Sequence, residues 1–177
     1  MRDKTKQLYT ISAFTDNSPG VLHRLVTTFT KRKVNIESLT VSETERHGVS
    51  RFTIVVMVDE DLIKTIVKQI DRIIEVREVY ALLNEDLIFK EIALIRVNAS
   101  NADDRVKVEE HAERYGARVI YVESDSLVVE ATGMADDIKS LYRLLEPHGI
   151  AEFIQSGRIA LCKHKEDRMN GKGAVGH

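Results

Sequence analysis

The chain has 177 residues, of which 43% are apolar and 31% are charged, so it can fill a core and stay soluble. At roughly 100–200 residues per domain, this length predicts one ordinary domain or two small ones. A formal net charge of -2 excludes the overall basic balance that is typical of nucleic-acid-binding proteins. The single cysteine, Cys162, excludes an internal disulfide and argues against a cysteine-based metal site.

No stretch of the sequence approaches the roughly 18–20 apolar residues that a membrane-spanning helix needs. The charged start of the chain is not followed by the apolar segment of a secretory signal. We therefore expect a cytoplasmic protein of a reducing compartment, with no membrane partner.

The first half of the chain alternates between strand-like and helix-like patterns. After residue 20, apolar positions recur at the spacing of one helix face. Residues 52–58 are apolar on both faces, which is typical of a central strand. In chain order the predicted elements are a strand at 8–14, a helix at 20–33, strands at 36–41 and 52–58, a helix at 59–74 and a strand at 76–83.

A polar break at 84–86 separates the two halves, and the same order of elements then returns at an offset of about 80 residues, which indicates a duplicated unit. The predicted elements of the second half are a strand at 92–97, a helix ending at Gly116, strands at 119–122 and 127–129, a helix ending before Pro147 and an extended segment at 150–162.

This order predicts an α+β fold of two ferredoxin-like βαββαβ units, each an antiparallel sheet with two helices on one face. We predict one domain at 1–84, a second at 85–165, and a disordered tail at 166–177, which is charged and has no periodicity. Nothing in its own unit would cover the other face of each sheet. We therefore expect pairing between units, and a homodimer.

The turn at 16–20 carries the strongest candidate for a ligand site. Asn17 or Ser18 can cap the following helix, and Pro19 suits its first turn. Gly20 lets a ligand approach the backbone closely. Free N–H groups and the positive end of the helix dipole favour a carboxylate or a phosphate there. The spacing by itself fits an ordinary capped turn better than a ligand site.

Asn35 directly follows the end of that predicted helix. It can stop the helix in a left-handed conformation, or it can offer its side-chain amide to a ligand. When Asn35 is considered without its context, the helix stop is the simpler interpretation.

No constellation of catalytic residues is evident. The six histidines are scattered, and none stands with a carboxylate at the spacing of metal ligands. Cys162 lies at the end of a strand, where a buried or edge thiol is expected rather than a nucleophile. The sequence contains no nucleophile elbow, P-loop or dinucleotide-binding glycine motif. We therefore predict no enzyme activity, no catalytic residue and no metal site.

The βαββαβ order also occurs in RNA-recognition modules, which display aromatic side chains on their central strands. The predicted strand at 52–58 offers one aromatic residue, Phe52, among aliphatic ones. Aromatic residues make up only 6% of the chain, and the net charge is negative. We therefore expect no nucleic-acid partner.

Five segments occur together that are typical of one known family. They are DNSPGVL at 16–22, NIESLTVS at 35–42, RFTI at 51–54, EIALI at 91–95 and FIQSGRIA at 153–160. With them, residues 7–165 resemble the small regulatory subunit of acetolactate synthase (acetohydroxyacid synthase). Either of the first two segments alone would indicate only an amino-acid-binding ACT domain.

The resemblance implies a non-catalytic subunit with an N-terminal ACT domain and a second ACT-like domain. It implies that a branched-chain amino acid, usually valine, binds between two protomers and causes feedback inhibition. It also implies that the subunit activates a large catalytic subunit of the branched-chain amino acid pathway. That large subunit would hold thiamine diphosphate, magnesium and FAD, and this chain would hold no cofactor.

Carried over by position, the implied effector-binding residues are Asn17 and the backbone of Gly20, Val21 and Leu22 on one protomer, with Asn35 and Ile36 on the facing protomer. The carboxylate of a free amino acid suits N–H groups at a helix start, and its ammonium suits amide oxygens. This scheme needs neither Arg nor Lys.

The chain departs from the family pattern in two places. The family commonly has Gly two residues before the asparagine of the NIESL segment, where this chain has Lys33. A non-glycine residue in the left-handed conformation costs on the order of 1 kcal/mol. Residues 99–103 of the second half lack the Pro-Gly pair, so we expect that half to serve packing or partner contact rather than effector binding.

Three alternatives are open. The chain could be a stand-alone amino-acid-binding ACT protein that regulates a different partner, or an enzyme domain with no synthase partner. Co-purification with a large thiamine-diphosphate enzyme distinguishes both from the synthase subunit. An RNA-binding double module would instead show salt-dependent retention on polyanions.

Overall fold

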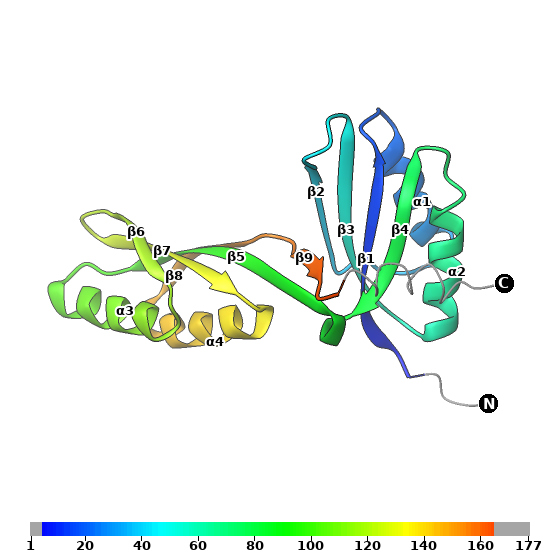
Figure 1. The fold of residues 1–177 in the computed structure, drawn as a ribbon. Helices are drawn as coiled ribbons and strands as arrows, with labels where there is room; N and C mark the ends of the chain where they lie inside the picture. The colour runs from blue at the N-terminus through cyan, green and yellow to red at the C-terminus, as the bar shows by residue number, and fades with distance from the viewer. Residues whose placement is uncertain (1–4, 165–177) are drawn as a thin grey trace. The chain divides into compact units, whose positions relative to one another are not determined.

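The computed structural model describes residues 5–164, which form two compact units (Figure 1). The first unit contains the described residues up to Phe89 together with those from Ile159 onward. The second unit contains Lys90 to Arg158.

The first unit is built on a four-stranded antiparallel sheet. Its elements are β1 (Gln7–Asp16), α1 (Val21–Thr30), β2 (Ser38–Glu43), β3 (Val49–Val58), α2 (Glu60–Ile70) and β4 (Val76–Leu83). The strand order is β2-β3-β1-β4, and each neighbouring pair is antiparallel. This order confirms the βαββαβ prediction and places β3 inside the sheet, as its apolar pattern indicated.

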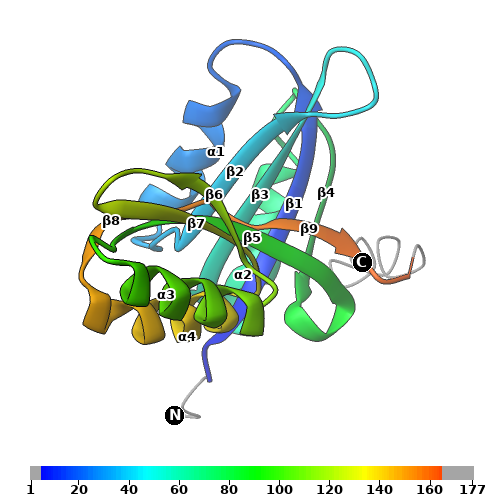
Figure 2. The same cartoon turned by 90° about the vertical axis from the view of Figure 1, so that its left-hand side faces the viewer.

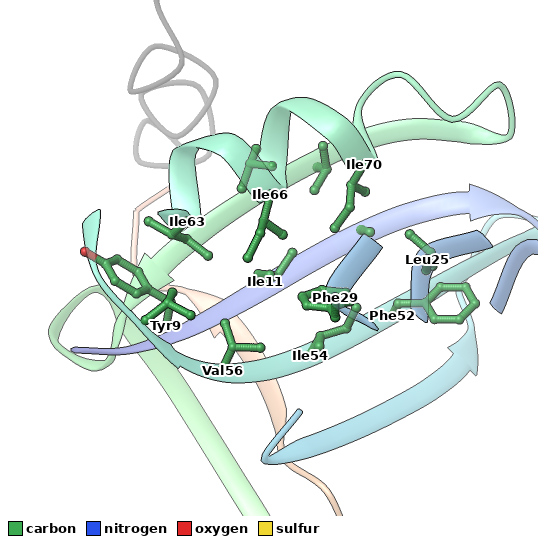
Figure 3. Close-up of a cluster of buried hydrophobic side chains, with 14 of the residues drawn as sticks. Tyr9, Ile11, Leu25, Phe29, Phe52, Ile54, Val56, Ile63, Ile66 and Ile70 are labelled. Atoms are coloured by element: carbon green, nitrogen blue, oxygen red, sulfur yellow. The ribbon is translucent and has the colours of Figure 1, made fainter. Parts of the chain in front are cut away.

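The core of the first unit lies between the sheet and its two helices (Figure 3). Since successive strand side chains face opposite sides of a sheet, alternate residues of β1 and β3 point to the helices. Ile11 and Ile54 pack there with Leu25, Phe29 and Ile66, and none of the five is more than 1% exposed. Burial contributes about 1.5–3 kcal/mol for each such side chain. This packing holds α1, and the loop before it, on the sheet.

The second unit repeats the arrangement. Its elements are β5 (Leu87–Asn98), whose first residues belong to the first unit, α3 (Ala102–Arg114), β6 (Arg118–Val122), β7 (Ser126–Gly133), α4 (Ala135–Leu145) and β8 (Ile150–Gln155), with a short 3-10 turn at Glu146–His148. Another 3-10 turn, Asn84–Asp86, precedes β5 in the first unit. The strand order is β6-β7-β5-β8. Helices α3 and α4 lie together on one side of these strands (Figure 2). Ile95, Val129 and Leu141 lie in the core between the two layers.

The units differ from the predicted ranges 1–84 and 85–165 because the last described strand, β9 (Ile159–Cys162), belongs to the first unit. Ala160 packs with Tyr80, Leu82 and Leu87 in a small buried cluster. The predicted tail at 166–177 lies outside the described residues.

Polar contacts also hold β9 in the first unit. Arg51 on β3 donates hydrogen bonds to the Ser12 hydroxyl (3.0 Å) and to the carbonyl of Ala160. Burial raises the pKa of Tyr80 above its usual value. Some of the sheet face opposite the helices is therefore covered by the chain's own last strand, and the expectation that nothing in the unit covers it is wrong there.

Several predicted elements have different limits in the structure. The helix predicted at 20–33 is the shorter α1, Val21–Thr30. The helix predicted at 59–74 ends at Ile70, with Asp71 as its C-cap, and Ile74 is 92% exposed. The strand predicted at 36–41 begins two residues later, at Ser38, because Asn35 and Ile36 belong to the connection after α1. Among the described residues, no helix combines the length and the apolar character needed to cross a membrane.

The end of α1 has the left-handed residue that the family pattern implied. Lys33 has φ 55°, and it is the one residue other than glycine with a positive φ in the described chain. The N–H of Lys33 donates to the Thr30 carbonyl (3.0 Å), and that of Val34 to the Phe29 carbonyl (3.1 Å). These two bonds form the Schellman helix end, whose left-handed position glycine favours. The equivalent position after α3 is Gly116, with φ 63°.

We predict that Lys33→Gly raises the free energy of unfolding by about 0.5–1 kcal/mol, because relief of left-handed strain exceeds the added entropy of the unfolded chain. Urea denaturation measures the change. Gly116→Ala is the matched control and should lower stability, since it introduces the same strain where a Cβ has open space. A Lys33→Gly variant that is no more stable than the parent chain would contradict this account.

Candidate functional site

The loop between β1 and α1 is fixed at two points by backbone hydrogen bonds. The N–H of Asn17 donates to the carbonyl of Gly48 at the start of β3 (2.9 Å). The N–H of Asp16 donates to the carbonyl of Glu75 before β4 (2.8 Å). Asp16 also forms an ion pair with Arg77 at 2.6 Å. The loop therefore has a defined position, although residues 17–20 are exposed.

The helix start differs from the prediction. The N-cap of α1 is Gly20, with φ 87°, and no side chain makes a capping bond to the helix. The prediction that Asn17 or Ser18 caps the helix is therefore wrong, and Pro19 precedes the helix instead of lying in its first turn. The first N–H groups of a helix have no partner within the helix. An uncapped and exposed start leaves them available to an anion.

The second unit uses the equivalent position differently. Asn101 is the N-cap of α3, and its Oδ1 accepts a hydrogen bond from the N–H of Asp104 at 2.8 Å. The side chain thus satisfies a donor that α1 leaves open. This difference supports the expectation that the second half has no equivalent anion site.

The residues of the first turn of α1 have separate roles. Val21 is only 2% exposed as a whole residue and packs in the core, so Gly20 and Leu22 form the exposed part of this turn. Leu22 is 46% exposed, so its side chain can contact an apolar group from outside the helix.

Both asparagines implied by the family are exposed, and each donates its side-chain amide to a carboxylate. Asn17 Nδ2 donates to Glu43 Oε1 at the end of β2 (2.7 Å). Asn35 Nδ2 donates to Glu37 Oε1, two residues along the chain (3.1 Å). The neighbouring Ile36 is partly buried and packs on the core.

Within one chain these residues do not form a single site. Asn17 precedes α1 and Asn35 follows it. A ten-residue helix, at about 1.5 Å per residue, is roughly 15 Å long. A free amino acid cannot touch both ends of such a helix, so one ligand could contact both asparagines only if they came from different copies of the chain.

Two neighbours of the loop were not predicted from the sequence. Arg24 pairs with Glu75, and its Nη1 lies 3.8 Å from the point that a Cβ on Gly20 would occupy. The spacing of four residues between Gly20 and Arg24, one helical turn, was the available signal. Glu43 gave no such signal, because it is 26 residues away from Asn17 in the sequence.

The described residues hold no group of three or more His, Cys, Asp or Glu side chains arranged to bind a metal ion. A hollow of about 310 Å³ lies elsewhere in the first unit, and Tyr9, Ile63, Lys64 and Val67 are among the residues that line it. Burial raises the pKa of Tyr9, and the hydrogen bond to Glu60 raises that of Lys64. None of the residues implied as effector ligands lines this hollow.

Comparison with known proteins identifies a family for both halves. Residues 11–78 match the model of the acetohydroxyacid synthase small-subunit-like ACT domain, and residues 90–164 match that of the small subunit of acetolactate synthase. The chain is 41% identical over 155 residues to the acetolactate synthase small subunit of Mycobacterium leprae, covering 88% of this chain and 91% of that one. It is 37% identical to that of Bacillus subtilis, with 90% and 92% covered.

A solved structure is similar over nearly the whole chain. The acetolactate synthase small subunit of Thermotoga maritima superposes with a TM-score of 0.82 at 28% identity, covering 90% of this chain and 99% of that one. Fold, sequence and family models agree on the small subunit rather than the catalytic one. The chain belongs to the family of acetolactate synthase small subunits, the regulatory and non-catalytic subunits of that enzyme.

Proposed function

We propose that the chain is a feedback sensor that binds a branched-chain amino acid, valine first, at the start of α1. The observation that carries the proposal is the exposed, uncapped N terminus of α1 beside Asn17. The N–H groups of Val21 and Leu22 would bind the ligand carboxylate. The Oδ1 atoms of Asn17 and Asn35 would accept from its ammonium.

The apolar side chain of the ligand would lie against Leu22 and Ile36. Leu22 is 46% exposed, and Ile36 packs on the edge of the core without being fully buried. A shallow apolar surface of this kind suits a side chain with three or four carbons. It would gain little from a larger or a charged side chain.

Topology supports a site shared between two copies. Strand β2 lies at the edge of its sheet, so its outer backbone groups can pair with another strand. If two β2 strands paired antiparallel about a two-fold axis, the start of each would lie beside the end of the other. Asn35, just before β2, would then approach Glu43 of the second copy, and with it Asn17. We therefore propose a homodimer with two such sites.

The regulated partner in this proposal is the large catalytic subunit of acetolactate synthase. The thiamine diphosphate, magnesium and FAD of the holoenzyme would be held by that subunit, in the cytoplasm. A ligand at a dimer interface binds more tightly to one packing of the two copies than to another if the two packings differ at the site. Ligand binding then favours one packing, and this change can alter the activity of the catalytic subunit.

Valine should raise the melting temperature of the full chain. At a concentration of about 100 times the Kd, ligand binding stabilises the folded state by roughly 2.7 kcal/mol. Thermal unfolding is measured with valine, leucine and isoleucine, each at millimolar concentration. The absence of any shift with all three would contradict the proposal.

Asn17→Ala should weaken valine binding and relieve inhibition of the reconstituted enzyme without unfolding the chain, because Asn17 is exposed and does not cap α1. Losing one hydrogen bond to a charged group lowers the affinity by about tenfold or more. Calorimetric titration and circular dichroism are the measurements. An Asn17→Ala variant that loses its fold would show that the side chain is structural.

The purified chain should form no acetolactate from pyruvate, and adding it to the catalytic subunit should raise the rate of that subunit. The rate is measured over a titration of the small subunit at saturating cofactors. If the chain co-purifies with no thiamine-diphosphate enzyme and leaves the rate unchanged, the stand-alone ACT protein becomes the better account.

A further inference from the structure

The two asparagines of the proposed site share one arrangement in the structure. In each, the side-chain NH₂ group donates to a carboxylate, that of Glu43 for Asn17 and that of Glu37 for Asn35. The two pairs come from different parts of the chain, since Glu43 is 26 residues from its partner and Glu37 only two. The same orientation of the side-chain amide, with its NH₂ group toward a carboxylate, therefore occurs twice in different local structures.

An ionised carboxylate can only accept hydrogen bonds, so it determines which end of an amide faces it. Glu43 must face the NH₂ group of Asn17, and the Oδ1 atom is then left for another donor. The same holds for Glu37 and Asn35. Among residues 5–164, no group donates to either Oδ1. Each asparagine is thus held as an acceptor, which a protonated amine satisfies and a carbonyl oxygen does not.

The carboxylates also contribute charge. Neither Glu43 nor Glu37 has a cationic partner within the described part of the chain, whereas the nearby acids Asp16 and Glu75 are paired with Arg77 and Arg24. Their negative charges therefore favour a cation close to the asparagines. Both glutamates are exposed, so solvent reduces this effect, and orientation of the amides is the larger one.

We propose that Glu43 and Glu37 are positioning residues that make the site select a protonated amine, so that it takes an α-amino acid and rejects the 2-oxo acid of the same carbon skeleton. This inference rests on the proposed function, because it concerns the same ligand site. The 2-oxo acid has the same carboxylate and apolar group, but its keto oxygen would face the lone pairs of Oδ1. A site that hydrogen-bonds one polar group strongly rejects an analogue that cannot supply it.

Calorimetric titration of the full chain with L-valine and with 3-methyl-2-oxobutanoate tests the proposal. The parent chain should bind the 2-oxo acid at least roughly a hundredfold more weakly than valine. Glu43→Ala should weaken valine binding by about tenfold and leave the affinity for the 2-oxo acid unchanged, so the discrimination falls by the same factor. Glu43→Gln keeps an acceptor for Asn17 without the charge and should fall between the two.

Glu45→Ala is the matched control, because Glu45 lies on the same hairpin, is exposed and, among residues 5–164, forms an ion pair with Arg46 alone, at 3.9 Å. It should bind both ligands as the parent chain does. Valine binding by Glu43→Ala at the parent affinity, or a parent chain that binds both compounds equally, would overturn the inference while the effector site stands. Failure of the parent chain to bind any branched-chain amino acid would instead overturn the proposed function, and this inference with it.

Discussion

The structure of the first unit depends on the packing of a helix, α1, that begins without a capping side chain. The N–H groups at the start of α1 have no side-chain acceptor, because Gly20 occupies the N-cap position and Asn17 is turned toward Glu43. A buried end of this kind would be destabilising, but this one is exposed, so water or a ligand can satisfy it. The packing of α1 on the sheet through Leu25 and Phe29 supplies the stability that a cap would otherwise add. The side chains of the loop are then not needed to cap the helix, as the proposed ligand site requires.

The second unit shows the alternative outcome for the same fold. Its helix α3 starts with a capping asparagine, Asn101, and the left-handed residue after the helix is a glycine, Gly116. Both ends satisfy the local preferences of the backbone. In the first unit the N-cap is Gly20, which supplies no capping side chain, and the left-handed residue after α1 is Lys33 instead of glycine. Weaker local stabilisation of this kind is common at functional sites, and it accords with the ligand site proposed at the start of α1.

The last described strand, β9, belongs to the first unit of the fold. Strand β9 follows the second unit in sequence but packs in the first, where Ala160 lies with Tyr80 and Leu82. A fragment ending at residue 84 would lack this cover and would expose the side chains beneath it. The first unit is therefore not a segment that can be separated by one cut, although its sequence pattern ends at residue 83.

Local patterns in the sequence were sufficient for the order of helices and strands, the two-unit α+β fold and the family, because periodicity and short motifs depend on neighbouring residues. The comparison with the family pattern also indicated Lys33 as a left-handed residue after the first helix, which the structure has. Tertiary structure decided the N-cap of α1, the place of β9 and the orientation of Asn17. The Asn17 contact joins residues 26 positions apart, and the contact of Arg51 with Ala160 joins residues 109 apart. No local pattern encodes such pairs, since only the folded sheet brings them within hydrogen-bonding distance.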